Sequence, residues 1–366
     1  MPTAPLKSDT MFFRGVGTAT PPNRYSKAEC LTAFEQSDWF ARLDTRSHFI
    51  ARTVLSHDNG IETRQLAVDL LDEVFVIDPD TLARRFLTQA PKLAALAGER
   101  ALADAGLTAA DIGAVVVSTC TGYLCPGLSG YVVERLGLAS DVGAFDLVGQ
   151  GCAAALPNLQ LGRSLLLAGT CEHVLSICVE VSSAAMYLDN DPGVLISACL
   201  FGDGAGAAVL SRTPLPGRRR IAWSDSESFV DPSQRAALMF EQRGGMLRNI
   251  LTRAVPALAA RHARALFDRV TGRAGLGSDD IAAWILHAGG RDVLLALATA
   301  FGRAGPPETA FPYSAAMLRA YGNLSSAFVY FVLAAAIDDE APGGWWWLSS
   351  FGAGFSCHGV LLEVSE

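Results

Sequence analysis

Hydrophobic positions along the chain alternate between short apolar runs and longer runs with helical periodicity. Residues 113–119 (GAVVVST), 282–288 (AAWILHA) and 345–351 (WWWLSSF) are apolar on successive positions, which is typical of strands that are buried on both faces. Helix-like stretches separate these runs. The alternation predicts an α/β fold in which helices cover the faces of a buried sheet.

Two parts of this pattern occur twice. Residues 99–122 and residues 268–290 share a helix-like run, the letters AGL, an Asp-Ile pair and an apolar strand. Residues 200–211 and residues 350–364 each contain a glycine-rich turn that leads into an apolar strand. Because the two echoes come in the same order, the sequence predicts a duplicated unit.

The boundary between the two halves is predicted in residues 211–220 (SRTPLPGRRR), where proline and glycine interrupt the pattern. We therefore expect an N-terminal half of residues 1–212 and a C-terminal half of residues 213–366. The three consecutive arginines are interpreted as a solvated turn rather than a binding patch.

A third element of the repeat carries a polar side chain in each half of the chain. Cys152 follows the first Asp-Ile pair at nearly the spacing at which Asn323 follows the second, and each introduces a helix-like run. If the halves pack about a pseudo-twofold axis, these two helix starts lie close to each other. The duplication therefore predicts that Cys152 and Asn323 share one region.

His287 is the histidine that the repeat favours. It ends the repeated strand of the C-terminal half and leads into a Gly-Gly turn, and strand ends are where α/β folds place their chemistry. The other five histidines lie in loops or polar helical surroundings, except His358, which follows a glycine turn and is a weaker candidate.

A cysteine, a histidine and an asparagine together suit acyl transfer to sulfur. A free thiol has a pKa of about 8.5, and a helix start alone stabilises a thiolate by only about 0.3–1 kcal/mol, so a cationic imidazole is needed. Histidine and asparagine could also bind one carbonyl oxygen and stabilise the negative charge that it acquires.

Composition and charge narrow the classes of function. Half of the 366 residues are hydrophobic, and the net charge is −8 without a long Lys/Arg run, which argues against nucleic acid or an acidic membrane as the main partner. The N-terminal residues lack the apolar run of an export signal, and no stretch is long enough for a membrane span. We expect a cytoplasmic protein.

The eight cysteines are interpreted as reduced thiols. Cys171, His173 and Cys178 lie close together in the sequence, but no second ligand pair accompanies them, so we expect no metal site.

Several motifs together resemble one known family. The segments GVGTATPPNRYS, NGIETR, CTGYLCPGLSGYVVERLGL, GQGCAAAL, LFGDGAGAAVL, LHAGG, YGNLSSA and SFGAGFS are similar to those of type III polyketide synthases, the chalcone and stilbene synthase family of the thiolase-like superfamily. The resemblance covers nearly the whole chain. It implies duplicated βαβαβαββ halves that form an α-β-α-β-α layered architecture.

The resemblance also implies roles for individual residues. The catalytic cysteine, histidine and asparagine of the family fall on Cys152, His287 and Asn323, and a phenylalanine that gates the cavity and assists decarboxylation falls on Phe201. The residue that reaches toward the partner's cavity in the family's homodimer falls on Cys125. Further pocket residues implied in this way are Cys120, Ser182, Asn249 and Ser325.

This sequence departs from the plant members of the family at two places. A second gating phenylalanine is replaced by Asn249, and the MLRNIL segment around it is similar to bacterial members that make alkylresorcinols or alkylpyrones. The usual basic residues for the phosphates of CoA are not visible near residues 56–64. Substitutes for a CoA site are Arg52, Arg64, Gly289, Gly290 and Arg291.

The implied reaction loads an acyl-CoA starter on Cys152, decarboxylates malonyl-CoA, condenses the two and closes a ring, with no metal, flavin or nicotinamide. An alternative is a β-ketoacyl-(acyl-carrier-protein) synthase of the initiating class, which performs a single condensation. A nucleotide-binding module that uses GDGAGA is disfavoured, because these glycines precede an apolar strand rather than a helix. A non-catalytic thiolase-like partner protein is disfavoured by the intact Cys, His and Asn.

Overall fold

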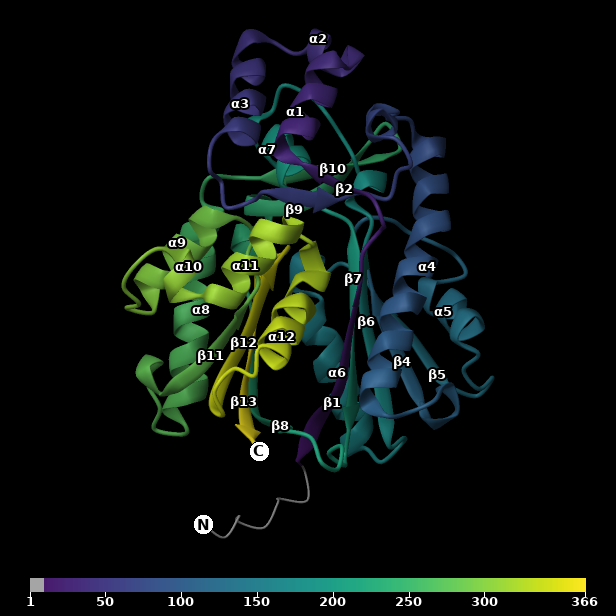
Figure 1. Ribbon diagram of the computed structural model, residues 1–366, viewed down its shortest axis with the longest axis vertical. Helices are drawn as coiled ribbons and strands as arrows, with labels where there is room; N and C mark the ends of the chain where they lie inside the picture. The colour runs from purple at the N-terminus through teal and green to yellow at the C-terminus, as the bar shows by residue number, and fades with distance from the viewer. Residues whose placement is uncertain (1–9) are drawn as a thin grey trace.

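The structure, a computed structural model, describes residues 10–366 (Figure 1). The first nine residues, which belong to the stretch expected to lack an export signal, lie outside this range. No helix in the described part of the chain has both the length and the apolar character needed to cross a membrane.

A nine-stranded mixed sheet runs through the molecule in the order β11-β12-β13-β8-β1-β7-β6-β4-β5. Its strands are β1 (Met11–Ala19), β4 (Ala114–Ser118), β5 (Gly143–Leu147), β6 (His173–Glu180), β7 (Gly204–Ser211), β8 (Arg220–Val230), β11 (Ile281–Leu286), β12 (Gly344–Gly352) and β13 (Ser356–Ser365).

The sheet consists of two similar halves that meet at β1 and β8. The order β1-β7-β6-β4 matches the order β8-β13-β12-β11, and in both halves only the last of the three pairings is parallel. The halves join where Met11–Phe13 pairs with Ile221–Trp223. The repeat in the sequence therefore corresponds to a repeat in strand order and direction.

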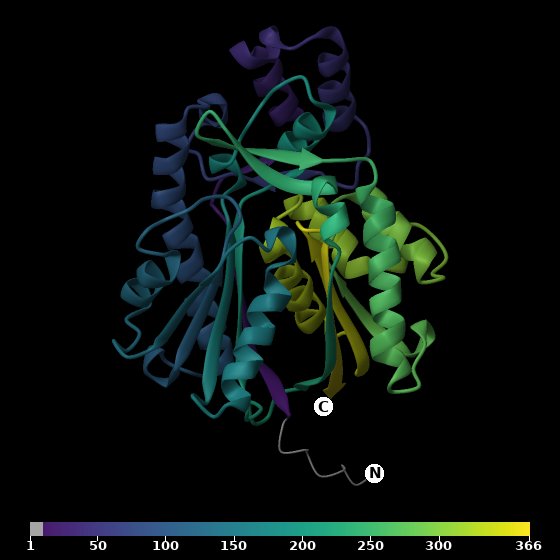
Figure 2. The same cartoon turned by 180° about the vertical axis from the view of Figure 1, so that it is seen from behind.

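Helices form three layers around these sheet halves (Figures 1 and 2). The outer layers are α4 with α5 on one side and α8 with α9 on the other, and α6 and α12 lie between the two halves. The bounds are α4 (Pro79–Ala105), α5 (Leu128–Leu136), α6 (Ala155–Leu167), α8 (Val255–Gly272), α9 (Arg291–Ala300) and α12 (Phe328–Asp338). This confirms the expected α-β-α-β-α fold.

The duplication is incomplete in one place. β5 extends the first half beyond β4, whereas the described part of the second half has no strand at the corresponding position. α10 (Pro307–Ala310) and α11 (Pro312–Tyr321) occupy the chain there. The sequence explains the difference, because Pro306, Pro307 and Pro312 lack a backbone N–H, and one of the consecutive Pro306 and Pro307 would have to face β11 in any strand paired there. The domain boundary near residue 212 stays a prediction.

A smaller layer of elements covers one end of the sheet halves and appears at the top of Figure 1. Its members are β2 (Arg24–Ser26), α1 (Lys27–Gln36), α2 (Asp38–Arg42), α3 (Thr45–Ser56), β3 (Thr63–Gln65), α7 (Pro192–Leu200), β9 (Leu238–Arg243) and β10 (Met246–Leu251). α7 contacts both α3 and β10, so this layer connects segments that are far apart in the sequence.

Candidate active site

Cys152 lies in a short 3-10 turn, η3 (Gly151–Ala153), directly before α6. Gly151 has φ 54, and a Cβ there would press on Ala353, so the turn depends on glycine. Ala153 is held by a hydrogen bond from the Ser350 hydroxyl to its carbonyl oxygen (3.0 Å). The sulfur is therefore presented from a turn that is fixed against β12, and the residue is only 8% exposed.

His287 follows the last residue of β11, as the sequence predicts. Its backbone N–H donates to the Ser349 carbonyl on β12 (2.9 Å). The ring is packed edge-on against Phe328 of α12 and Phe351 of β12, at centroid distances of 5.7 Å and 5.0 Å. Neither ring nitrogen makes a hydrogen bond within the described chain, so both are free to meet a substrate or a proton donor.

Asn323 follows α11, and hydrogen bonds fix both its backbone and its side chain. Its backbone exchanges hydrogen bonds with the segment around Phe201, from Asn323 N to the Leu200 carbonyl and from Gly202 N to the Asn323 carbonyl (both 3.0 Å). The side-chain Oδ1 accepts from the Ser325 N–H (2.8 Å), and Nδ2 donates to the Gly289 carbonyl (3.2 Å). The amide is thus oriented and lies next to the turn that follows His287.

Ser325 connects Asn323 to the cysteine. Its hydroxyl donates to the sulfur of Cys152 (3.2 Å) and lies 3.3 Å from the sulfur of Cys120. Ser325 has φ 50, an uncommon conformation for a residue other than glycine, and such residues cluster at functional sites. Through these contacts the structure brings Cys152, Asn323 and the end of β11 with His287 into one region.

Burial acts on the two ionisable groups in opposite directions. It raises the pKa of Cys152 to about 12, an effect that the hydrogen bond from Ser325 partly offsets. Burial lowers the pKa of His287 to about 3. Neither group therefore ionises on its own near neutral pH.

Glu180, the last residue of β6, belongs to the site although no sequence motif pointed to it. Its carboxylate is fully buried and accepts hydrogen bonds from Thr121 (3.0 Å), from the Cys120 sulfur (3.3 Å) and from the Ser326 hydroxyl. The Ser325 hydroxyl lies 3.2 Å from the same carboxylate and shares its one proton between Glu180 and the Cys152 sulfur. These bonds explain how a carboxylate can exist in the interior. The available signal was an acidic residue at the end of a mostly apolar strand, HVLSICVE.

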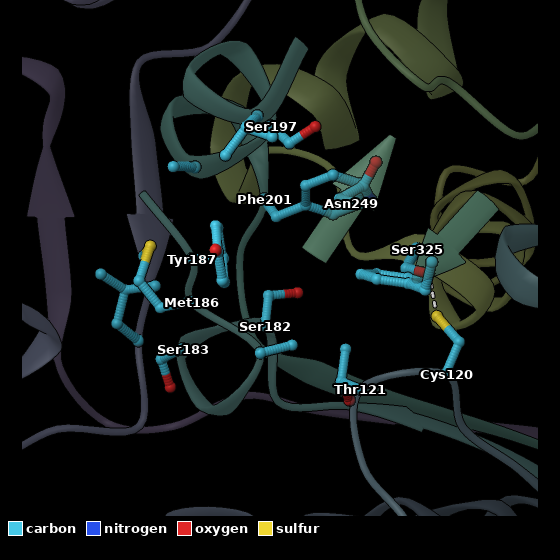
Figure 3. Close-up of a pocket in the computed structure, with 15 residues that line it drawn as sticks. Cys120, Thr121, Ser182, Ser183, Met186, Tyr187, Ser197, Phe201, Asn249 and Ser325 are labelled. Carbon is cyan, nitrogen blue, oxygen red and sulfur yellow. Dashed lines mark hydrogen bonds between the residues drawn. The ribbon is translucent and has the colours of Figure 1, made fainter. Parts of the chain in front are cut away.

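A pocket adjoins this region (Figure 3). Five residues expected near the site line it: Cys120, Ser182, Phe201, Asn249 and Ser325. Its remaining walls come largely from α7 and from the 182–187 segment, with Phe240 of β9 beside them. The cavity therefore extends from the end of β4 toward the covering layer.

The other expected residues are placed differently. Cys125 is exposed and does not line this cavity. Arg52 is a surface residue paired with Glu35 (2.6 Å). Arg64 is buried and donates to the carbonyls of Ala198 (2.8 Å) and Phe201 (3.0 Å). It therefore stabilises the end of α7, and little of its side chain is accessible to a phosphate.

Gly289, Gly290 and Arg291 form the turn between His287 and α9. Gly290 precedes the first turn of this helix, and Arg291 pairs with Asp58 (3.0 Å) and Glu308 (3.1 Å). Its side chain is partly exposed. No cluster of three or more His, Cys, Asp or Glu residues within residues 10–366 is arranged to hold a metal ion.

The structure also settles how the GDGAGA segment folds. Its glycines lead into β7, which begins at Gly204, rather than from a strand into a helix. This geometry does not fit a dinucleotide fingerprint, so the nucleotide-binding alternative is set aside.

The sequence is similar to two known families. Residues 22–222 match the family described as FAE1/Type III polyketide synthase-like protein, and residues 272–364 match the family described as 3-oxoacyl-[acyl-carrier-protein] synthase III C terminal. The chain is 31% identical to 1,3,6,8-tetrahydroxynaphthalene synthase of Streptomyces peucetius subsp. caesius over 360 residues, which cover 95% of this chain and 91% of that protein.

Two further proteins extend the comparison. The chain is 29% identical to 3,5-dihydroxyphenylacetyl-CoA synthase of Amycolatopsis orientalis, with 86% of this chain and 82% of that protein covered. Among solved structures, PKS-I of the brown alga Ectocarpus siliculosus superimposes with a TM-score of 0.87 at 25% identity, over 96% of this chain and 98% of that one.

Proposed function

The chain belongs to the type III polyketide synthase family, and from this premise we propose that Cys152, His287 and Asn323 form its catalytic centre. The synthase alternative with a single condensation is not supported, because the relatives are polyketide synthases. The observation that carries the assignment is the chain of contacts from the Cys152 sulfur through Ser325 to Asn323 and on to the carbonyl of Gly289 beside His287.

Loading begins when a ring nitrogen of His287 takes the proton of the Cys152 thiol. The thiolate attacks the carbonyl carbon of an acyl-CoA starter, and the thiolate of CoA leaves with the proton from the imidazolium. Direct transfer of a proton from the neutral thiol to the neutral imidazole suits this site, because burial disfavours an isolated charge on either group.

Extension uses malonyl-CoA. Asn323 Nδ2 and an N–H of His287 donate to its thioester carbonyl oxygen while the carboxylate leaves as carbon dioxide, which places the negative charge on that oxygen as an enolate. The enolate carbon attacks the acyl group on Cys152, and the cysteine leaves as a thiolate. Phe201 borders the cavity here, and its apolar ring disfavours the charged carboxylate before it leaves.

Repetition and ring closure complete the product. The substrates are CoA thioesters, and no step in this scheme calls for a metal, flavin or nicotinamide. The Gly289–Gly290 turn and Arg291, at the start of α9, are the proposed contacts for CoA. We also propose that the protein forms a homodimer in which Cys125 lies near the partner's site. This is supported by the exposure of Cys125 and of nearby Tyr123 at the surface of a single chain.

Purified protein tests this proposal with malonyl-CoA and a panel of acyl-CoA starters, with the products identified by mass spectrometry. We expect Cys152→Ala to lower product formation by at least about a thousandfold, because the nucleophile is lost. We expect Asn323→Ala to leave acylation of Cys152 largely intact and to slow decarboxylation of malonyl-CoA by roughly a hundredfold or more.

Cys171→Ala is the matched control, since this half-buried thiol lies outside the cavity and its loss should not change the products. Unchanged products from Cys152→Ala would refute the nucleophile. Equal loss of both steps in Asn323→Ala would refute the division of roles.

A further inference from the structure

β11 lies at one edge of the nine-stranded sheet in the described chain. It pairs with β12 on one side, whereas its counterpart in the first half, β4, pairs with strands on both sides. The open side of an edge strand carries backbone N–H and C=O groups without strand partners, and such groups need other partners when they are buried. Leu286, the last residue of β11, is completely buried, so this requirement applies to it.

Ser314, in the first turn of α11, provides both hydrogen bonds that Leu286 needs. Its hydroxyl accepts from the Leu286 N–H (3.2 Å) and donates to the Leu286 carbonyl oxygen (3.0 Å). The Ser314 side chain is itself completely buried. A single hydroxyl therefore replaces a neighbouring strand at this position, which is possible because a serine hydroxyl is both a donor and an acceptor.

The next residue along the chain is His287, and its backbone is bound from the opposite side. The His287 N–H donates to the Ser349 carbonyl of β12 (2.9 Å), whereas the ring nitrogens have no hydrogen-bond partner within residues 10–366. The ring packs edge-on against Phe328 and Phe351. The position of the imidazole is therefore set by its backbone and by this packing, and not by polar contacts of the ring.

α11 also connects the end of β11 to Asn323. Ser314 lies near the start of this helix, and Asn323 follows its end. The helix thus joins the two residues that are proposed to bind the same thioester carbonyl oxygen. Two donors act together only if both lie at hydrogen-bonding distance from that oxygen, and a misplacement of about 1 Å can lower a rate roughly a hundredfold.

We propose that Ser314 is a positioning residue of the active site, which fixes the end of β11 to α11 and so sets the position of the His287 imidazole relative to Asn323. Ser314 acts through the backbone of Leu286. The inference rests on the proposed function, because it assigns to Ser314 the geometry that His287 and Asn323 need for decarboxylation. It predicts that loss of the hydroxyl slows decarboxylation without weakening the binding of malonyl-CoA.

Decarboxylation of malonyl-CoA to acetyl-CoA by the purified protein tests this, with kcat and KM measured for the wild type, for Ser314→Ala and for Ser314→Thr. We expect Ser314→Ala to lower kcat roughly tenfold and to change KM by less than about twofold, because Ser314 contacts Leu286 rather than the substrate. Ser314→Thr keeps the hydroxyl and should restore kcat to within about threefold of the wild type.

Ser176→Ala is the matched control. Ser176 is a completely buried serine on β6 whose hydroxyl lies 2.8 Å from that of Tyr330. Its loss also removes a buried hydrogen bond, but kcat should stay within about twofold of the wild type. Circular dichroism establishes that each variant is folded.

Ser314→Cys replaces Ser314→Ala if the alanine variant does not fold. Its thiol is similar in size to the hydroxyl but is a weaker hydrogen-bonding group, so we again expect a lower kcat with little change in KM.

The outcomes separate the two proposals. A folded Ser314→Ala or Ser314→Cys with kcat within about twofold of the wild type, or an equal loss of kcat in Ser176→Ala, would overturn this inference and leave the proposed function intact. A wild-type protein that does not decarboxylate malonyl-CoA would overturn the proposed function, and this inference with it.

Discussion

At the scale of single residues, the proposed catalysis depends on the passage of a proton between two buried groups. The Cys152 thiol and the His287 imidazole are both neutral at neutral pH, because burial raises the pKa of the first and lowers the pKa of the second. Moving the proton from sulfur to nitrogen creates a thiolate and an imidazolium without uptake or release of a proton by the solvent. The fraction of thiolate is then independent of pH between the two pKa values.

This predicts an unusual pH profile for alkylation of Cys152 by iodoacetamide. Between about pH 6 and about pH 8 the rate in the wild type should be nearly flat, because proton transfer within the pair involves no net protonation. In His287→Gln the thiol must lose its proton to the solvent, so the rate should be lower and should rise about tenfold per pH unit. Mass spectrometry of the Cys152 peptide gives both profiles, and equal slopes would contradict the shared proton.

The sequence identified the catalytic candidates at this scale but not their surroundings. Cys152, His287 and Asn323 follow from the repeat and the family motifs, and their roles stay predictions that the contacts support. Glu180 was not foreseen, because a glutamate is placed in an interior only by donors from distant segments, here Thr121 and Ser325 among others. Arg64 was expected at a phosphate, whereas it is buried against the end of α7.

At the scale of elements, the close approach of β1 to α4 is fixed by small residues. A Cβ at Gly17 would lie 2.3 Å from both the Ala101 nitrogen and the Ala97 carbonyl oxygen on α4. No side chain can relieve such a contact, since both atoms belong to the backbone. The helix therefore packs at this distance only because position 17 of β1 carries no side chain.

Gly17→Ala should accordingly push α4 away from the sheet and lower the free energy of unfolding by at least about 2 kcal/mol. Urea denaturation followed by circular dichroism measures the change. The matched control is Gly130→Ala in α5, where a Cβ has no neighbour within 4 Å and should stabilise the helix by roughly 0.5–1 kcal/mol. Similar urea midpoints for Gly17→Ala and Gly130→Ala would contradict the prediction, because they would show that α4 accommodates the added Cβ at little cost in stability.

Most elements agree with the sequence pattern, and the exception has a local cause. The apolar runs form β4, β11 and β12, and helices begin shortly after Cys152 and Asn323, as expected. In the second half, the consecutive Pro306 and Pro307 disfavour the strand that the repeat would place between α9 and α12, because one of them would face β11 without an N–H to donate.

At the scale of the whole molecule, the nine-stranded sheet ends in an exposed strand. β5 pairs with β4 on one side, and its residues Ala144, Phe145 and Asp146 are exposed. A free strand edge with an apolar side chain is a ready surface for a second copy of the chain. This supports the homodimer included in the proposed function.

We expect Phe145→Lys to shift the protein from dimer to monomer, because a lysine charge disfavours edge-to-edge pairing. Sedimentation velocity at several protein concentrations measures the shift. Leu295→Lys, at an exposed apolar position of α9, is the control and should leave the dimer intact. A dimer that survives Phe145→Lys, or a wild type that is monomeric throughout, would contradict an interface at β5.

The fold class, the family and the catalytic candidates Cys152, His287 and Asn323 could be inferred from the sequence alone, because they rest on local periodicity, on a repeat and on motifs that are contiguous in the chain. Only the tertiary structure decided which polar groups are satisfied. Ser197 has its partner within one helix, Glu180 finds its donors on other segments, and the side-chain oxygen of Asn249 finds none within residues 10–366. The physical reason is that the cost of burying a polar group depends on atoms brought together from distant parts of the chain, which no local pattern specifies.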